Sequence, residues 1–277
     1  MFDCHCHIIP GIDDGASNLA QSLEMAKIAA SEGISVIACT PHITPGVYDN
    51  TTHNISEALV RLQKSILDNG IPIRLVIGAD VHISPGIIHG VNARNIPTLD
   101  SSRYLLLEFS HHQMTPHLEQ LAFEILSAGY IPVLTHPERL SWIEDGFSLF
   151  KTLAERGCWL QITSGAIIGK FGRKPQYWAT HFLSEGLTHV IATDAHDPKR
   201  RPPIIQAAIA RVTELVGAAE TRRIIFDRPN AILEDSDSTL VDKPIGLSKA
   251  LLANSDNKNQ KKPNLFYRIS RRWKQNP

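Results

Sequence analysis

The feature that most restricts the fold is an alternation of short apolar runs with amphipathic segments across residues 1–226. The apolar runs are nearly continuous, as is typical of parallel strands that are covered on both faces. Three amphipathic segments with helical spacing end at Gly33, Gly70 and Gly129, residues that favour helix termination. Repeated β-then-α units predict a parallel sheet with right-handed crossovers, and seven units favour a closed (β/α)7 barrel. The expected strands are 2–8, 35–40, 73–78, 104–108, 131–135, 159–163 and 189–193.

Composition sets the class of protein. A chain of 277 residues, of which 43% are hydrophobic, is long enough for one barrel with a large core. Lys and Arg number 28, as do Asp and Glu, and this formal net charge of zero argues against a general nucleic-acid partner. The start MFDCHCHIIPG has neither the basic nor the apolar region of a signal peptide. The four cysteines are few and scattered, which indicates a cytoplasmic protein without disulfides.

The composition changes near residue 235. Residues 235–277 contain four Asp, no Glu and nine Lys and Arg, a net charge of +5 that leaves −5 for residues 1–234. We therefore expect a barrel over 1–234 and a basic, partly disordered tail over 235–277, with a flexible linker at 254–263. The last segment could form a short helix touching an anionic membrane or a partner, and an exposed basic end is the simpler alternative. Its apolar residues are Leu265, Phe266, Ile269 and Trp273.

Histidines and carboxylates stand at the ends of successive predicted strands. His5 and His7 are two residues apart on the first strand and share a face, and Asp194 and His196 repeat this spacing after the last strand. Because the carboxyl ends of parallel barrel strands meet at one rim, we expect these groups to converge there. The set is His5, His7, Asp13, Asp14, His42, Asp80, Glu108, His136, Asp194 and His196.

This crowding predicts a metal site. Each group alone has a structural explanation, such as packing for H-x-H or helix capping for Glu108. Together they would repel one another and lose solvation at large cost unless cations compensate them. Mixed imidazole and carboxylate ligands fit Mn²⁺, Fe²⁺ or Zn²⁺, and the share of oxygen favours Mn²⁺. So many side chains suit two or three ions.

Other known chemistries are not supported by the motifs. No cysteine is followed six positions later by the Arg that a cysteine phosphatase needs. The G-x-S-x-G, H-E-x-x-H, Walker A and G-x-G-x-x-G motifs are absent. Cys4 and Cys6 alternate with the first two histidines and are interpreted as packing residues. His82, His111 and His112 could line the cleft.

Two arginines follow the predicted site motifs. Arg139 lies in T-H-P-E-R and Arg201 after D-A-H, with Arg200 as the neighbouring alternative. A guanidinium offers paired donors that match phosphate oxygens. The alternative for each arginine is a salt bridge at the rim, with Glu138 for Arg139 or Asp197 for Arg201. We expect Arg139 and Arg201 to contact a phosphate group.

The motifs D-x-H-x-H-I-x-P-G-I-D-D-G, T-P-H, G-A-D, R-Y-L-L-L-E-F, T-H-P-E-R and T-D-A-H-x-x-x-x-R-P-P occur in order over residues 1–233. They resemble the bacterial PHP-class protein-tyrosine phosphatases of capsule and exopolysaccharide loci (the CpsB/YwqE type). The resemblance implies a distorted (β/α)7 barrel of the PHP fold, with three ions, usually manganese, and phosphate contacts from Arg139 and Arg201. Asp80 departs from the family pattern, which commonly has Glu. The implied ligands are His5, His7, Asp14, His42, Glu108, His136, Asp194 and His196, with Asp80 as the ninth.

We expect phosphomonoester hydrolysis, in which a hydroxide held between the ions attacks phosphorus in line. The ions and the two arginines, Arg139 and Arg201, would neutralise the equatorial oxygens. Asp14, Asp194 or His42 could protonate the leaving phenolate, and the sequence assigns none of them.

The resemblance implies phosphotyrosine as the substrate, carried by a membrane-associated tyrosine kinase of polysaccharide export. The basic tail would suit a position beside that kinase. Three alternatives stay open: a small-molecule PHP phosphatase, for example of the histidinol-phosphatase type, a metal-dependent nuclease or amidohydrolase, and a binding scaffold without turnover. The neutral charge counts against a nuclease, and the intact ligand set counts against a scaffold.

Overall fold

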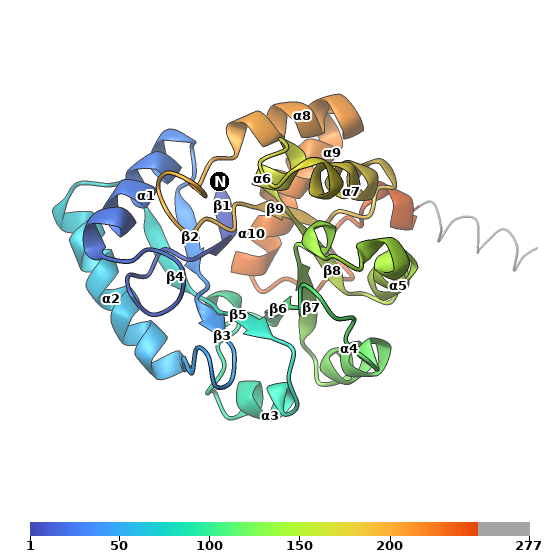
Figure 1. The fold of residues 1–277 in the computed structure, drawn as a ribbon, viewed down its shortest axis with the longest axis horizontal. Coiled ribbons are helices and arrows are strands. Elements are labelled where there is room, and N and C mark those ends of the chain that lie inside the picture. The colour runs from blue at the N-terminus through green and yellow to red at the C-terminus, as the bar shows by residue number, and fades with distance from the viewer. Residues whose placement is uncertain (249–277) are drawn as a thin grey trace, which may run out of the picture.

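The structure is a computed structural model that describes residues 1–248. In Figure 1 the strands occupy the centre and most helices surround them. The predicted linker and the basic aromatic segment lie outside the described residues. Within residues 1–248, no helix combines the length and apolar composition that crossing a bilayer requires.

All strand pairs in residues 1–248 are parallel, as the β-then-α pattern predicts. They form a three-stranded sheet in the order β1-β2-β4 and a six-stranded sheet in the order β3-β5-β6-β7-β8-β9. The strands are β1 (Phe2–Cys6), β2 (Val36–Cys39), β3 (His42–Ile43), β4 (Arg74–Ile77), β5 (Asp80–His82), β6 (Tyr104–Glu108), β7 (Ile131–Thr135), β8 (Trp159–Thr163) and β9 (Val190–Ala192).

The prediction of one closed barrel is confirmed only in part, because the described strands pair into two sheets. The short strands β3 and β5 follow β2 and β4, beyond the ends of the predicted runs 35–40 and 73–78. Pro41, which has no N–H to donate, lies between β2 and β3. At Gly78, between β4 and β5, a Cβ would lie 2.9 Å from Leu99 and 3.0 Å from Thr40. His42 and Asp80 begin the two short strands.

The two sheets also meet between β1 and the end of β9. The Asp194 N–H donates to the His5 carbonyl, and the His7 N–H donates to the Ala195 carbonyl, both at 2.8 Å. These bonds bring the first and last segments of the site together.

Helices α2 and α4 bury apolar residues at helical spacing, whereas Leu19 at the start of α1 is exposed. The Asn18 side chain caps α1, and Thr51 and Asn54 form a reciprocal capping box at the start of α2. On α2 the apolar residues Ile55, Leu62 and Ile66 lie on one face and are buried. The α-helices are α1 (Leu19–Ser31), α2 (Thr52–Asp68), α3 (Ile87–Asn92), α4 (Leu118–Ser127), α5 (Ile143–Glu155), α6 (Ser164–Ile167), α7 (Arg173–Ser184), α8 (Gln206–Val216), α9 (Ala218–Arg222) and α10 (Arg228–Leu233).

Two apolar clusters hold the elements together. The larger packs the helices on the sheets. The smaller, which we call the inner cluster, joins seven strands to α10, whose Ala231 and Ile232 contribute to it. In Figure 1 α10 lies behind the central strands. The inner cluster therefore fills the space between the sheets on the side away from the strand carboxyl ends.

Strand β1 changes face partway along its length. Its pairing with β2 shifts register between Asp3 and Cys6. Strict alternation would put Cys4 and Cys6 on one face, yet Cys4 packs in the inner cluster and Cys6 in the larger one. Both cysteines are packing residues, as predicted, and the irregularity aims His5 and His7 at the strand ends.

Residues 235–248 contact the body of the protein. The Arg103 N–H donates to Asp235 at 2.7 Å, and the Tyr104 hydroxyl donates to the Ser236 carbonyl at 3.0 Å. The Gly246 N–H donates to the Gly186 carbonyl at 3.0 Å. The domain boundary at 235 remains a prediction, and the first part of the predicted tail packs on the fold.

Candidate metal centre and phosphate site

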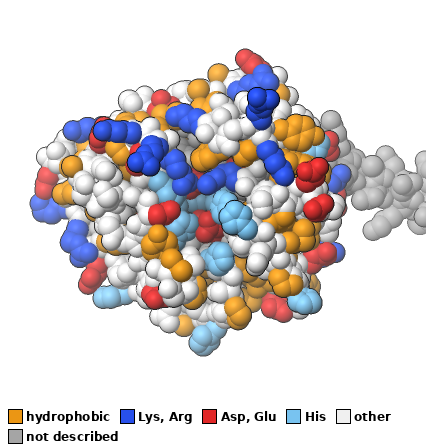
Figure 2. Space-filling view, viewed as in Figure 1, with side chains coloured by type: hydrophobic (Ala, Val, Ile, Leu, Met, Phe, Trp, Pro, Cys, Tyr) orange, Lys and Arg blue, Asp and Glu red, His pale blue; other side chains and the backbone are white. Residues whose placement is uncertain are grey.

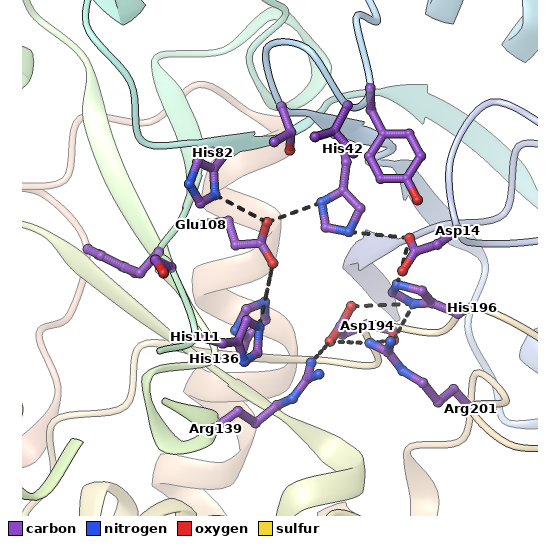
Figure 3. A pocket seen from close by; sticks show the side chains of 15 residues that line it. Asp14, His42, His82, Glu108, His111, His136, Arg139, Asp194, His196 and Arg201 are labelled. Atoms are coloured by element: carbon purple, nitrogen blue, oxygen red, sulfur yellow. Dashed lines mark hydrogen bonds and ion pairs between the residues drawn. The ribbon is translucent and has the colours of Figure 1, made fainter. Parts of the chain in front are cut away.

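The predicted metal ligands meet at the carboxyl ends of the strands, where six line one cleft and His5, His7 and Asp80 lie buried against them. The cleft has a volume of about 340 Å³, and its wall includes Asp14, His42, Glu108, His136 and His196. Figure 2 shows histidines gathered in a hollow at the centre of this face. Figure 3 shows the side chains pointing toward one another from separate strands and loops. The convergence that parallel strands predict is therefore present.

The deepest part of the cluster is the His5–His7 pair. Their Nε2 atoms are 3.1 Å apart, and both side chains are buried. His7 Nδ1 lies 2.7 Å from Asp13, and His5 Nδ1 lies 3.0 Å from the Gln161 side-chain oxygen. These outer contacts leave both Nε2 atoms facing the cluster, an arrangement typical of metal-binding histidines.

A second group surrounds Asp14. Its Oδ1 lies 3.3 Å from His42 Nε2 and 3.4 Å from His196 Nε2. The donor atoms of His7, Asp14, His42 and His196 all lie within 4.8 Å of one another. Donor atoms bound about 2.1 Å from one ion are about 3–3.5 Å apart, so this spacing suits a shared cation.

A third group surrounds Glu108 at the end of β6. His136 Nε2 and His111 Nε2 each lie 3.7 Å from its Oε1, and His42 Nδ1 lies 3.2 Å from its Oε2. His82 Nδ1 is 3.9 Å from the same carboxylate. Of the three histidines that sequence left open, His82 and His111 line the cleft.

Asp194 joins the histidines to the two arginines. Its Oδ1 lies 3.4 Å from His5 and 3.5 Å from His7. Its Oδ2 accepts from the Arg139 guanidinium and, at 2.6 Å, from that of Arg201. Both guanidiniums lie over the Phe171 ring, at 4.5 Å and 5.7 Å from its centroid.

The alternative of rim salt bridges is wrong for both arginines. Glu138 is buried and accepts from the Thr163 N–H at 2.9 Å, and burial raises its pKa to about 7. Asp197 accepts from the backbone N–H groups of Lys199 and Arg200. Arg201 lines the cleft, whereas Arg200 does not.

Asp80 gives the clearest test of whether the residues fit a metal. Its side chain is fully buried, and neither carboxylate oxygen has a hydrogen-bond partner in the described structure. Burial and the neighbouring Glu108 raise the pKa of Asp80. His42 Nδ1 and His136 Nδ1 are likewise buried without hydrogen-bond partners. A buried carboxylate without hydrogen bonds is costly, so the donor set fits divalent cations.

The carboxylates favour positive charge at this place. Burial lowers the pKa of His5, but Asp80 and Asp194 outweigh it and raise that pKa to about 9. Burial likewise opposes protonation of His42, whose contacts with Asp14 and Glu108 raise its pKa to about 12. Burial, with His196 beside it, lowers the pKa of His7 to about 3. The neutral ring of His7 is the form that binds a metal.

The cysteines are unsuited to nucleophilic chemistry, as predicted. All four are buried as free thiols. Burial raises the pKa of Cys6, and burial raises the pKa of Cys158 to about 12. A thiol with so high a pKa carries almost no thiolate at neutral pH.

Sequence reasoning missed the residues that support the predicted ligands. Asp13 was placed in the converging set, but its contact with His7 was not predicted. Nothing in the pattern indicated Gln161, Phe171 or Tyr48, although the Tyr48 ring lies at 5.7 Å from that of His42, inclined by 17°. The partners of Gln161 and Phe171 are distant in sequence.

Comparisons with known proteins found a matching family model and several similar proteins. Residues 1–234 match the family model described as capsular polysaccharide synthesis, CpsB/CapC. The chain is 37% identical to the tyrosine-protein phosphatase YwqE of Bacillus subtilis over 201 residues, 73% of this chain and 79% of YwqE. It is 28% identical to the tyrosine-protein phosphatase CpsB of Streptococcus pneumoniae over 240 residues, 85% of this chain and 99% of CpsB.

A solved structure from work on YwqE and CpsB, described there as metal-dependent tyrosine phosphatases, has the same fold. It superposes with a TM-score of 0.83 at 33% identity, covering 86% of this chain and 96% of the other.

Proposed function

This chain belongs to the CpsB/CapC family, and on that premise we propose that it is a metal-dependent protein-tyrosine phosphatase. The observation that carries the proposal is the cluster of buried imidazoles and carboxylates with two arginines at its edge. The family resemblance seen in the sequence motifs is confirmed. We also infer that the two sheets, joined where β1 meets β9, are a distorted (β/α)7 barrel of the PHP type.

We propose that the nine predicted ligands hold two or three ions. Four sets of donor atoms lie within 4.8 Å of one another and share members, which supports bridging between neighbouring ions. Mn²⁺ is our first choice because carboxylate oxygens are numerous, with Fe²⁺ or Zn²⁺ as alternatives. Divalent cations bound here would neutralise the carboxylates and supply Lewis-acid activation of water and of the phosphoryl group. The proposed ligands are His5, His7, Asp14, His42, Asp80, Glu108, His136, Asp194 and His196.

The remaining cleft residues are suited to hold the substrate. Arg139 and Arg201 would bind the equatorial phosphoryl oxygens, because a guanidinium presents paired donors to them. Asp194 holds both guanidiniums toward the cluster. The opposite wall includes Val47 and Tyr48, which offer apolar contact to the aromatic ring of phosphotyrosine.

The substrate protein is proposed by analogy with the family. We propose that the substrate is a phosphorylated tyrosine kinase of polysaccharide export, and that the two proteins interact in the cytoplasm at the membrane. Four buried free cysteines suit that compartment. The basic segment after residue 249 would assist this location through anionic lipid. Removing residues 254–277 should then weaken binding to anionic vesicles without changing turnover of a phosphotyrosine peptide, and unchanged vesicle binding would reject this role.

Metal analysis combined with an activity assay tests the function. We expect more than one bound ion per chain, hydrolysis of phosphotyrosine peptides that EDTA abolishes and Mn²⁺ restores, and loss of activity in His136→Ala. His112→Ala, at an exposed neighbour outside the cleft, is the matched control. Full activity in EDTA would contradict the proposal, and a preference for histidinol phosphate would select the small-molecule alternative.

Asp80→Asn tests the ninth ligand separately from turnover. The raised pKa of Asp80 means that its charged form destabilises the metal-free fold. We expect Asp80→Asn to have a higher Tm than the unaltered protein in EDTA. We also expect it to bind Mn²⁺ at least about tenfold more weakly, because replacing even a residue that only hydrogen-bonds to a ligand weakens metal affinity by that factor. Asp68→Asn, at an exposed helix position, controls for charge. Unchanged Mn²⁺ affinity would remove Asp80 from the ligand set.

A further inference from the structure

One side of the cleft mouth carries a group of exposed cations that the proposed chemistry does not use. Lys170 and Arg173 lie at the α6–α7 connection, and Lys199 and Arg200 lie between β9 and α8. All four side chains are exposed, and within residues 1–248 none forms an ion pair. We call these four residues the basic rim. Figure 2 shows Lys and Arg side chains along the upper edge of the histidine-lined hollow.

The basic rim is continuous with the phosphate site. Lys170, Arg200 and Arg201 line a small cavity of about 90 Å³ together with Phe171. Arg201 also lines the main cleft, and its Nε is buried without a hydrogen-bond acceptor. An anionic group in the small cavity would therefore lie beside a phosphoryl group held by Arg201.

The charge of the rim is local. Residues 1–234 carry a formal net charge of −5, so cations on this side do not follow from the overall composition. Asp197, the carboxylate within the rim loops, is occupied by the backbone N–H groups of Lys199 and Arg200 at 2.8 Å and 2.7 Å. The opposite wall, with Thr44, Val47 and Tyr48, is uncharged. The mouth therefore offers one basic side and one apolar and aromatic side.

We propose that the basic rim binds an acidic peptide segment adjacent to the target phosphotyrosine. This inference rests on the proposed phosphatase function and names the substrate class that the cleft prefers. The aromatic ring of the target would lie toward Tyr48, while acidic neighbours in the same chain face Lys170 and Arg200. A peptide fits better than a membrane surface because the cations border a concave cleft and share Arg201 with it.

Matched peptides test the inference with the full-length, Mn²⁺-loaded protein. One phosphotyrosine peptide carries glutamates on both sides of the target, and the other carries glutamines at the same places. We expect kcat/KM about tenfold higher for the acidic peptide at low salt, falling toward equality at high salt because exposed charges are screened. The Lys170→Gln/Arg200→Gln variant should lose this preference and keep its activity on p-nitrophenyl phosphate. The Lys27→Gln/Arg61→Gln variant removes two exposed cations from α1 and α2 and should keep the preference.

The outcomes separate the two proposals. Hydrolysis of both peptides at equal rates in the unaltered protein would overturn the role of the rim and leave the phosphatase function intact. Hydrolysis of neither peptide would overturn the phosphatase function itself. An equal loss of preference in the control variant would show a general charge effect and reject the rim. Rim-dependent binding to phosphatidylserine vesicles, without peptide preference, would assign these cations to lipid and also reject the inference.

Discussion

His136, directly after β7, and Asp194, two residues after β9, adopt the left-handed backbone conformation, with φ of 33° and 49°. This conformation is unfavourable for residues other than glycine and is found where surrounding contacts impose it. Here it turns both side chains into the cleft as the chain leaves β7 and β9. The bonds from Asp194 to Arg139 and Arg201 help to hold it there.

Phe171 is a positioning residue for both cleft arginines. A cation over an exposed aromatic ring gains about 0.5–1 kcal/mol, and Phe171 serves two cations. We therefore expect Phe171→Leu to raise the KM for a phosphotyrosine peptide and the Ki for inorganic phosphate about fivefold, with kcat and bound metal nearly unchanged. Phe171→Tyr keeps the aromatic ring, so its KM and Ki should equal those of the unaltered protein. An unaltered Ki in Phe171→Leu would contradict this role.

At the scale of elements, the ends and interruptions of strands aim the site. The short strands β3 and β5, which follow β2 and β4 after a break, begin with His42 and Asp80. The two residues are paired neighbours in the sheet, which brings their side chains to the same level. The register shift in β1 turns its histidines toward them. Irregular pairing is thus concentrated where the ligands lie.

Residues 235–248 act as a strap across the base of the fold, and Gly246 tests this. A Cβ at Gly246 would lie 2.0 Å from the Glu185 carbonyl oxygen and 2.9 Å from that of Gly186. We expect Gly246→Ala to lower the free energy of unfolding by about 1–3 kcal/mol, because packed backbone must separate. Urea denaturation measures this, and Lys243→Ala, at an exposed position, is the control. Wild-type stability in Gly246→Ala would show that the strap adds nothing to the fold.

At the scale of the whole molecule, the two ends of the fold have opposite chemistry. The cleft end gathers charged groups, whereas the other end is filled by the inner cluster and closed by α10. A buried histidine of that second end, His189, accepts from the Leu160 N–H at 3.1 Å. Burial and the nearby Arg228 hold its pKa well below the usual value.

His189 should therefore make stability depend on pH. In the unfolded chain the His189 ring takes up a proton near pH 6.5, whereas in the folded protein it does not. The free energy of unfolding is therefore highest above that pH and falls as the pH drops below it. The expected slope is up to about 1.4 kcal/mol per pH unit. His189→Asn keeps an acceptor for Leu160 and should remove that slope. Urea denaturation of both proteins between pH 5 and 7.5 in EDTA compares them without metal, and parallel curves would refute the assignment.

The sequence alone determined the parallel β-then-α architecture and the convergence of the ligands. Apolar periodicity is a local property, and parallel strands bring their carboxyl ends to one edge, so His5, Glu108 and Asp194 could be placed together from spacing. The helix ends at Gly33, Gly70 and Gly129 could also be predicted from the local sequence, and all three glycines have positive φ.

The tertiary structure decided what depends on contacts between distant segments. The division into two sheets was one such feature, and Gly78, at the break between β4 and β5, comes close to Thr40 and Leu99. Gln161 contacts His5 across 156 residues, and Phe171 meets Arg139 and Arg201 only after three loops pack together. Such contacts carry no periodic signal, because they are set by register and packing between elements and not by the pattern within any one of them.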